Sequence, residues 1–454
     1  MNDIDAFEQS LKNAVMIHER GEVAEAELLY RQLLDRAPRY TAAWEHLGRA
    51  CSDQGRLDEA VACFQQVITL DSRHASAYNN LGNAYRELRR LDHALASFDQ
   101  ALAIQPSLLP AYKNKAMALI WDGRVADGLA TYEEALRHAP GDADTHNQIG
   151  QLRLLLGDFA GGWPEYEWRW KTGEMTLPSL DRPLWNGTPL YGQTILLVAE
   201  QGLGDSIQFV RYAAWLKQRY RCRVLFSCQP PLRQLISTCD GIDGWLNAPT
   251  DPVPYDVFAP LIHVPGVLAQ STHDFPSTNC YLSANPDLVD QWRSKLTPYR
   301  GRKIGVVWQG SPRLASAQVR NMPLPELARL ARLPDVQLFS LQKGPGAGQV
   351  QQFPEIIDLG RVLDETTGAF VETAAVLKCL DLLITADTSV AHVAGALGVP
   401  VWVGLCNVPD WRWQLTGEKT VWYPTMRLFR QSSPGAWTDV IDRIADALLT
   451  SNFA

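Results

Sequence analysis

The chain has 454 residues, of which 46% are apolar and 20% charged, the composition of an ordinary globular protein. Its formal charge of −8 comes from residues 1–170, which hold 17 Lys and Arg against 25 Asp and Glu, whereas residues 171–454 hold 25 of each. Neither part has the basic surplus needed to bind a nucleic-acid backbone, so we expect no nucleic-acid partner. The chain lacks an apolar run of the ~20 residues that span a membrane, and its N-terminus does not read as a signal peptide. We therefore expect a cytoplasmic protein with no membrane span.

The first part of the chain repeats every 34 residues. The units begin at Phe7, Thr41, Ala75, Leu109 and Ala143. Each unit has glycine or alanine at its eighth and twentieth positions and an aromatic residue at its twenty-fourth. Small residues let two antiparallel helices approach closely, and aromatic residues fill the space beside them. One such pair cannot bury its own apolar face, so neighbouring pairs stack into a solenoid. The register resembles the tetratricopeptide repeat, with about five units over residues 1–170.

The sixth position of these units is a candidate for partner binding. It carries Asn80 and Asn114 in the third and fourth units, with Lys12, His46 and Gln148 in the others. An amide both donates and accepts hydrogen bonds, so it can pair with the backbone of an extended peptide. Asn80 and Asn114 resemble two rungs of the asparagine ladder in O-GlcNAc transferase, which implies a protein or peptide acceptor in the repeat groove. The alternative is that both amides simply face solvent.

From residue 194 onward, short apolar runs alternate with helical segments. Strands are expected at 194–199, 223–228, 255–260, 304–308, 336–341, 381–385 and 400–404. This alternation indicates parallel sheets in doubly wound domains, which we place at 171–298 and 299–454. The tryptophan-rich end of the repeats, residues 157–170, is interpreted as the joint to the first of these domains. An amphipathic helix is expected over 437–449, crossing back onto that first domain.

Gly204 and Asp205 follow the first expected strand, at the carboxyl ends of the strands, where such folds bind ligands. Asp205 can serve as a general base there, or it can cap the following helix. The glycines also resemble part of a dinucleotide fingerprint, but Ile207 stands where its third glycine belongs, which argues against a dinucleotide site.

Other strand ends carry groups suited to phosphate. Asp387, Thr388, Ser389 and His392 follow the strand at 381–385 and open a helix, whose free N–H groups and dipole attract anions. His392 can instead be a core histidine. The ends of two further strands add the remaining candidates, which are Gly310, Ser311, Arg320 and Lys343. Together these groups suit the diphosphate of a departing nucleotide.

Residues 194–450 resemble a GT-B glycosyltransferase, closest to the heptosyltransferase family. The resemblance lies in Gly204-Asp205 and in Asp387-Thr388 with His392. It implies two Rossmann-like domains, with Asp205 as the catalytic base, Gly204 on the acceptor side, and the groups named above holding a nucleotide sugar. Arg320 stands where the family has a lysine. No Asp-x-Asp pair occurs in residues 171–454, so a reaction without metal or cofactor is expected.

The chain as a whole resembles bacterial repeat-fused glycosyltransferases, including those that modify flagellin. The expected function is transfer of a sugar, with inversion, from a nucleotide sugar to a hydroxyl of a protein held by the repeats. One alternative is glycosyl transfer in lipid-linked or surface glycan assembly, with the repeats docking a partner. A second alternative is a scaffold whose transferase half is inactive.

Overall fold

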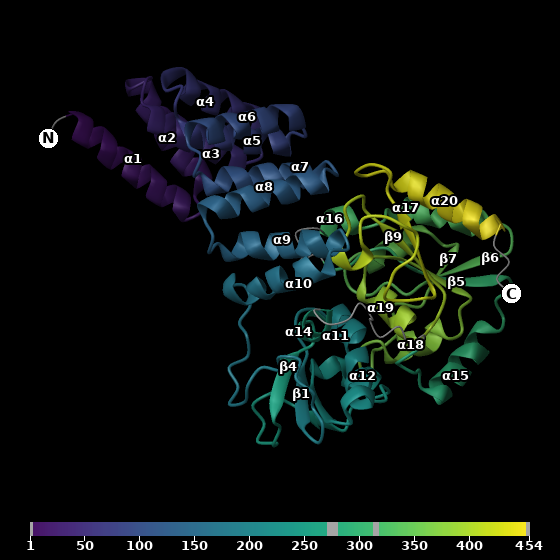
Figure 1. Cartoon of the computed structure of the whole chain (residues 1–454). Helices are drawn as coiled ribbons and strands as arrows, with labels where there is room; N and C mark the ends of the chain where they lie inside the picture. The colour runs from purple at the N-terminus through teal and green to yellow at the C-terminus, as the bar shows by residue number, and fades with distance from the viewer. Residues whose placement is uncertain (1–2, 270–279, 312–316, 451–454) are drawn as a thin grey trace. The chain divides into compact units, whose positions relative to one another are not determined.

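The computed structural model describes residues 3–269, 280–311 and 317–450. The chain divides into two compact units, Met1–Ile149 and Gly150–Ala454, which are described here one at a time (Figure 1).

The first unit consists of antiparallel helix pairs. Its described helices are α1 (Asp3–Glu19), α2 (Val23–Arg36), α3 (Thr41–Asp53), α4 (Leu57–Leu70), α5 (Ala75–Glu87), α6 (Leu91–Ile104), α7 (Leu109–Trp121) and α8 (Val125–His138). Helix α9 (Ala143–Leu155) begins in this unit and ends in the second one. Helices α3, α5, α7 and α9 begin at four of the five positions where the 34-residue register starts a repeat, whereas α1 begins at Asp3 and not at Phe7. The predicted solenoid of helix pairs is therefore confirmed.

Close approach within each pair depends on the glycine or alanine at the eighth position. A Cβ atom on Gly48 would lie 2.7 Å from the Phe64 ring, and one on Gly82 would lie 2.5 Å from the Phe98 ring. Both distances are shorter than any ordinary carbon contact, so the aromatic residue at position 24 occupies the volume that a side chain at position 8 would need. The repeat pattern thus records a packing requirement.

The second unit begins with helical structure and continues into two sheets. Helix α10 (Phe159–Tyr166) and the 3-10 segment η1 (Glu167–Lys171) complete the fifth repeat pair. Trp163 of α10 is 1% exposed, and its ring meets the Trp411 ring edge-on at 5.3 Å between centroids. Its indole also packs against Gly266, because a Cβ there would lie 3.4 Å from Trp163. Trp163 therefore forms a joint, as the tryptophan-rich segment predicts.

The first described sheet has the order β3-β2-β1-β4, and all its strands are parallel. Its strands are β1 (Thr194–Val198), β2 (Arg223–Ser227), β3 (Gly244–Leu246) and β4 (Val257–Pro260). The helices that follow these strands are α11 (Leu203–Phe209), α12 (Arg211–Tyr220), α13 (Arg233–Ile236), α14 (His263–Ala269) and α15 (Pro286–Leu296). Short 3-10 turns such as η2 (Pro230–Leu232) complete the connections.

The second described sheet has the order β10-β9-β8-β5-β6-β7 and is also fully parallel. Its strands are β5 (Arg302–Val307), β6 (Val336–Ser340), β7 (Ile356–Asp358), β8 (Leu382–Ala386), β9 (Val401–Leu405) and β10 (Met426–Arg430). The accompanying helices are α16 (Ala317–Arg320), α17 (Leu324–Ala328), α18 (Val371–Leu377), α19 (Ser389–Ala396) and α20 (Trp437–Thr450), with 3-10 segments η3 (Arg329–Arg332), η4 (Ala347–Gln352) and η5 (Trp411–Trp413). Each of the seven expected strands is present, with ends within two residues of those predicted. The α/β class is thus confirmed, while the GT-B arrangement stays a prediction.

The C-terminal helix corrects one expectation. The apolar face of α20, including Val440, Ile441 and Ile444, is buried in the core that contains Ile304 and Leu338 of the second sheet. The prediction that this helix crosses to the first α/β domain is wrong for the residues described. Its amphipathic pattern indicates a buried face but does not say which sheet receives it.

Candidate functional site

The site is built from two turns, each at the carboxyl end of a strand. Gly204 and Asp205 lie in the first turn of α11, after β1, and Ser389 begins α19, after β8. A Cβ atom on Gly204 would lie 3.0 Å from His392 Cδ2 and 3.4 Å from Ser389 Oγ. The Gly-Asp turn of the first sheet therefore contacts the start of α19 on the second. This juxtaposition is the one that the sequence motifs require if they serve one site.

Both oxygens of the Asp205 carboxylate have partners. Oδ2 accepts a 2.8 Å hydrogen bond from the backbone N–H of Gly202, and Oδ1 contacts the guanidinium of Arg412. The N-cap of α11 is Gly202, and Asp205 is the third residue of the helix, so Asp205 helps to cap α11 without being the N-cap residue that the sequence suggested. Its side chain remains 17% exposed, and each carboxylate oxygen has two lone pairs. It can therefore accept a further hydrogen bond from a ligand hydroxyl.

Arg412 organises this cluster, and its contacts were not expected from the sequence. Its Nη1 donates to Asp410 Oδ1 at 2.8 Å, and its Nε donates to Gln208 Oε1 at 3.0 Å. Its guanidinium lies 4.3 Å from the centroid of the Trp411 ring. Arg412 therefore holds two carboxylates from different sheets in one buried ion-pair network.

The two carboxylates on Arg412 differ in proton affinity. Burial raises the pKa of Asp205 above its ordinary value, and Arg412 opposes this shift without cancelling it. Burial also acts to raise the pKa of Asp410, but Arg412 and Arg320 outweigh it and lower that pKa. Asp205 is thus the more basic carboxylate, which is the property that a general base needs.

The expected donor side is also assembled. Arg320 Nη2 lies 2.6 Å from Asp387 Oδ2 and donates to the Asp387 carbonyl at 3.1 Å. Gly310 is adjacent, since a Cβ there would lie 3.8 Å from the Asp387 carbonyl and from Thr388 Cγ2. Ser311 follows Gly310 and is exposed. The Thr388 hydroxyl lies 3.0 Å from Thr385 Oγ1, and its side chain does not cap α19.

His392 is 5% exposed and occupies the first turn of α19. Its Nδ1 lies 2.9 Å from Tyr423 Oη, and its ring stacks on Trp413 at 5.3 Å between centroids. Burial lowers the pKa of His392 to about 3, so the ring is neutral near pH 7. His392 is thus a buried histidine whose outer edge still faces Gly204.

Lys343 does not join these groups in the described contacts. Its Nζ lies 2.6 Å from Glu365 Oε1 and also contacts the Leu363 carbonyl. The structure brings the other candidate residues of the α/β part into one neighbourhood through the contacts given above. Its two arginines face three carboxylates, those of Asp205, Asp387 and Asp410. A bound diphosphate would therefore compete with these carboxylates for Arg320 and Arg412.

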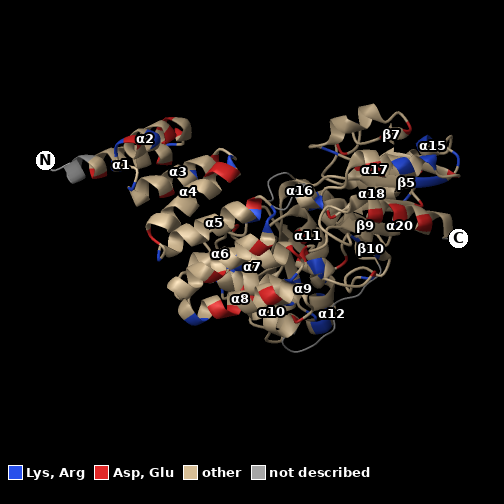
Figure 2. Cartoon of the chain, turned by 90° about the horizontal axis from the view of Figure 1, so that it is seen from above, with Lys and Arg blue, Asp and Glu red and all other residues tan. Residues whose placement is uncertain are grey.

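Asn80 and Asn114 form hydrogen bonds between repeats. Asn114 Nδ2 donates to Asn79 Oδ1 at 2.9 Å, and Asn80 Nδ2 donates to Glu45 Oε1 at 3.3 Å. Asn79, one position earlier than the expected rung, also donates to Asn80 at 3.4 Å. Four side chains from three repeats thus form one polar line, on helices that carry charges of both signs (Figure 2). Their role in binding a peptide stays a prediction.

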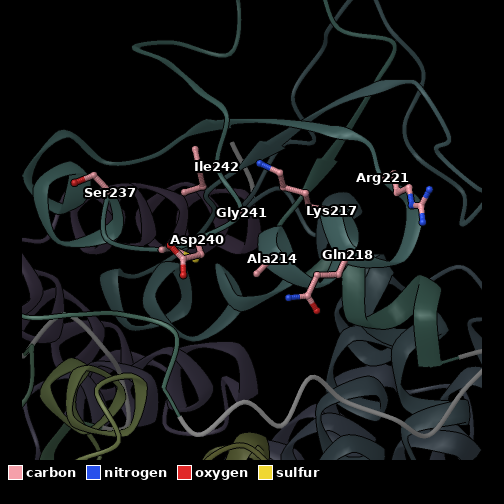
Figure 3. A pocket seen from close by; sticks show the side chains of 9 residues that line it. Ala214, Lys217, Gln218, Arg221, Ser237, Asp240, Gly241 and Ile242 are labelled. Atoms are coloured by element: carbon pink, nitrogen blue, oxygen red, sulfur yellow. The ribbon is translucent and has the colours of Figure 1, made fainter.

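One hollow in the described residues is lined by residues outside the predicted site. It has a volume of about 660 Å³ and is lined by residues of α12 and of the loop after α13, among them Lys217, Arg221 and Asp240 (Figure 3). It contains none of the predicted site residues. Within residues 3–269, 280–311 and 317–450, no group of three or more His, Cys, Asp and Glu side chains is arranged to hold a metal ion. In the same residues, no helix has the length and apolar character needed to cross a membrane.

Sequence reasoning missed three residues of the cluster. Gln208 lies three residues after Asp205 in α11 but outside the Gly-Asp motif, and Tyr423 lies in a loop without a recognisable pattern. Arg412 stands inside an aromatic run, Trp411-Arg412-Trp413, and a single charge in so apolar a run was the available signal that it is buried and paired.

Comparison with known proteins identifies the repeats. Models described as TPR repeat and tetratricopeptide repeat match residues 48–88, 75–108 and 19–62. The chain is 25% identical over 334 residues to Protein FlbA of Caulobacter vibrioides, an alignment that covers 65% of this chain and 53% of that protein. The chain thus spans about half the length of this relative.

Two of the solved structures that resemble the chain align with little more than a third of it. PilF of Pseudomonas aeruginosa is 17% identical, with a TM-score of 0.36, over 39% of this chain and 80% of that one. A thermophilic TPR protein of Thermus thermophilus is 19% identical, with a TM-score of 0.33, over 37% of this chain and 91% of that one. The family models and the helix pairs of the first unit agree. The N-terminal part of this chain is built from tetratricopeptide repeats.

Proposed function

We propose that the chain is a glycosyltransferase of GT-B type, which moves a sugar from a nucleotide sugar to a hydroxyl of a protein segment held by the repeats. One observation carries the proposal. A carboxylate of raised pKa, on Asp205 at the end of β1, lies in a turn that contacts the uncapped start of α19 at the end of β8. A candidate base and a candidate phosphate site are therefore neighbours although they belong to different sheets.

The chemistry assigns each group a task. Asp205 accepts the proton of the acceptor hydroxyl while that oxygen forms a bond to the anomeric carbon of the sugar. The bond from the anomeric carbon to the phosphate oxygen breaks, and the nucleotide diphosphate leaves with the electron pair. The N–H groups at the start of α19 stabilise this charge together with Arg320, which must exchange Asp387 for phosphate. Attack from the side opposite the leaving group inverts the anomeric configuration.

The extent of the alignment with Protein FlbA supports a conserved two-part architecture. It covers 65% of the chain, which is more than the 170 residues of the repeat region can account for. The similarity therefore extends into the α/β part. For the acceptor, support comes from the polar line through Asn114, Asn79, Asn80 and Glu45, whose three amides and one carboxylate suit an extended protein segment.

Thermal unfolding of the full chain with UDP-, GDP-, ADP-, CMP- and dTDP-sugars tests the donor. The panel is run with and without Mg²⁺ or Mn²⁺. A ligand at 100 times its Kd adds about 2.7 kcal/mol of stability, which raises the midpoint of the second unit by about 2–4 °C or more. One nucleotide class that stands out supports the proposal. A flat panel, repeated with free nucleotides, refutes it and favours the scaffold alternative.

Asp205→Asn tests the base. Asparagine keeps an oxygen that can accept from Gly202 N–H but cannot take a proton, so we expect the transfer rate to fall about 10²–10⁴-fold with donor affinity nearly unchanged. Asp240→Asn serves as the matched control, because it makes the same change at a carboxylate in a hollow that contains none of the predicted site residues. Retention of the full rate in Asp205→Asn contradicts the assignment.

A further inference from the structure

Tyr423 is a residue outside every motif, yet it touches the proposed site. It lies between β9 and β10, is 1% exposed, and its Oη is 2.9 Å from His392 Nδ1. Its ring is fixed against α19, because a Cβ on Gly395 would lie 2.4 Å from Tyr423 Cδ1. The hydroxyl therefore reaches His392 in a single, tightly packed geometry.

The neighbours of Tyr423 determine where its proton goes. Tyr281 Oη lies 3.0 Å from the carbonyl of Ile207, which can only accept, so the Tyr281 proton is directed there. Arg211 Nη2 donates to the same Tyr281 oxygen at 2.9 Å. The distance from Tyr281 Oη to Tyr423 Oη is longer, at 3.4 Å. The Tyr423 proton is consequently left for His392 Nδ1.

Arg211 packs against both tyrosine rings and donates to the backbone beside them. It is fully buried, and its guanidinium lies 4.5 Å from the Tyr281 ring centroid and 4.6 Å from that of Tyr423. Its Nη1 and Nε donate to the backbone carbonyls of Trp422 and Gln208. Burial raises the pKa of both Tyr281 and Tyr423, so each hydroxyl retains its proton near pH 7 and is available as a donor.

We propose that Tyr423 is a positioning residue, which holds His392 as the neutral Nε2–H tautomer and thereby aims an N–H donor at the Gly204–Asp205 turn. Nδ1 accepts from Tyr423, so the ring proton resides on Nε2. A Cβ on Gly204 would lie 3.6 Å from that nitrogen, and Nε2 has no hydrogen bond to any residue within the described ranges. The donor edge of the imidazole is thus available to a ligand.

This tautomer gives His392 and Asp205 different roles. An imidazole with Nε2 protonated donates a hydrogen bond to an oxygen of the sugar or of the leaving phosphate, and it cannot remove a proton from an acceptor hydroxyl there. Base catalysis then belongs to Asp205 alone. The identity of the oxygen rests on the proposed function, whereas the tautomer is a property of the free protein.

The test is long-range ¹H–¹⁵N correlation of the full chain labelled with [¹⁵N]histidine, without ligand. The chain has nine histidines, and His392→Gln identifies the signals of His392 by their disappearance. In the wild type we expect one tautomer, with an unprotonated Nδ1 and a protonated Nε2. In Tyr423→Phe the hydroxyl is lost, and we expect a mixture of both tautomers. Tyr212→Phe is the matched control, because the Tyr212 hydroxyl is buried and has no hydrogen-bond partner among the described residues.

Two results overturn the proposal: a wild-type His392 that carries its proton on Nδ1, and a Tyr423→Phe chain with the wild-type tautomer. The first needs no variant of Tyr423, so the proposal stays testable if Tyr423→Phe fails to fold. Once a nucleotide sugar that binds is known, Tyr423→Phe is expected to weaken the affinity for that nucleotide sugar about twofold if the two tautomers of His392 become equally populated. His392→Gln serves as the reference for complete loss of the imidazole. If no nucleotide sugar stabilises the chain but His392 has the predicted tautomer, the proposed function is refuted and this inference still holds.

Discussion

The contact between Gly204 and α19 can be tested by adding one methyl group. Gly204→Ala places a Cβ atom 3.0 Å from His392 Cδ2 and 3.4 Å from Ser389 Oγ. Gly204 is a helical residue of α11 that does not have a positive φ, so alanine is allowed by its backbone. The effect of the substitution therefore comes from the clash with α19 and not from strain at the residue itself.

The size of the effect follows from this distance. A carbon contact of 3.0 Å must lengthen by several tenths of an ångström, and overpacking of this kind costs about 1–3 kcal/mol. Alanine in place of glycine inside a helix returns about 0.5–1 kcal/mol. We expect a net loss of at most ~2.5 kcal/mol and a modest fall in the midpoint of thermal unfolding. The same displacement moves Asp205 away from the start of α19, and since a 1 Å misplacement can cost about 10²-fold in rate, we expect a fall of about tenfold.

The assay compares sugar transfer and thermal unfolding for the wild type, Gly204→Ala and Gly266→Ala. Gly266 is also a helical glycine of this unit, in α14, and an added Cβ would make ordinary contacts with Trp163 at 3.4 Å and beyond, so Gly266→Ala controls for a methyl group added without overlap outside the predicted site. A Gly204→Ala chain with unchanged rate and unchanged stability would show that α11 and α19 are not in the contact described, and the reasoning for one shared site would fail.

Three further predictions concern the second unit and the repeats. Burial would raise the pKa of Glu167, but His263 and Arg169 outweigh burial and lower that pKa from 4.5 to about 2. The Glu167 carboxylate therefore contributes about 3 kcal/mol of stability, which is present above pH ~4.5 and lost as the pH falls toward 2. Glu167→Gln should reduce the loss of stability at acid pH, measured by denaturant unfolding at a series of pH values. Arg320→Ala leaves the buried Asp387 carboxylate uncompensated and should cost about 3–5 kcal/mol, measured by the same unfolding, whereas a neutral result contradicts the ion pair. Replacing Asn80 and Asn114 together by Ala should weaken a protein acceptor in a binding titration while nucleotide-sugar binding stays unchanged, and equal acceptor affinity would rule the polar line out as the binding surface.

Local patterns specified the repeats and the central strands. In each repeat, the aromatic ring at position 24 occupies the volume beside the glycine or alanine at position 8, so these residue types recur every 34 residues. That spacing predicts where helices α3, α5, α7 and α9 begin. The seven expected strands are short apolar runs, which a buried parallel strand requires. The strands that escaped prediction, β3, β7 and β10, all lie at sheet edges, where less of the strand is buried and the apolar run is shorter or interrupted.

The candidate site was specified in its motifs but not in its contacts. The sequence places Gly204 and Asp205, and likewise Ser389 and His392, directly after predicted parallel strands, where such folds bind ligands. It does not show that these two strand ends, which belong to different sheets, come into contact. Lys343 has the same kind of position, but an acidic neighbour, Glu365, binds its ammonium group instead.

What the sequence by itself determined about this protein is therefore whatever depends on neighbours along the chain: the repeats, the central strands, and the turns that follow them. The tertiary structure decided the ion pair of Asp205 with Arg412, which are 207 positions apart, the hydrogen bond from Arg211 to the Trp422 carbonyl across 211 positions, and the sheet that receives α20. The physical reason is that a charge or an apolar face indicates the need for a partner, while packing of the whole unit selects which partner is within reach.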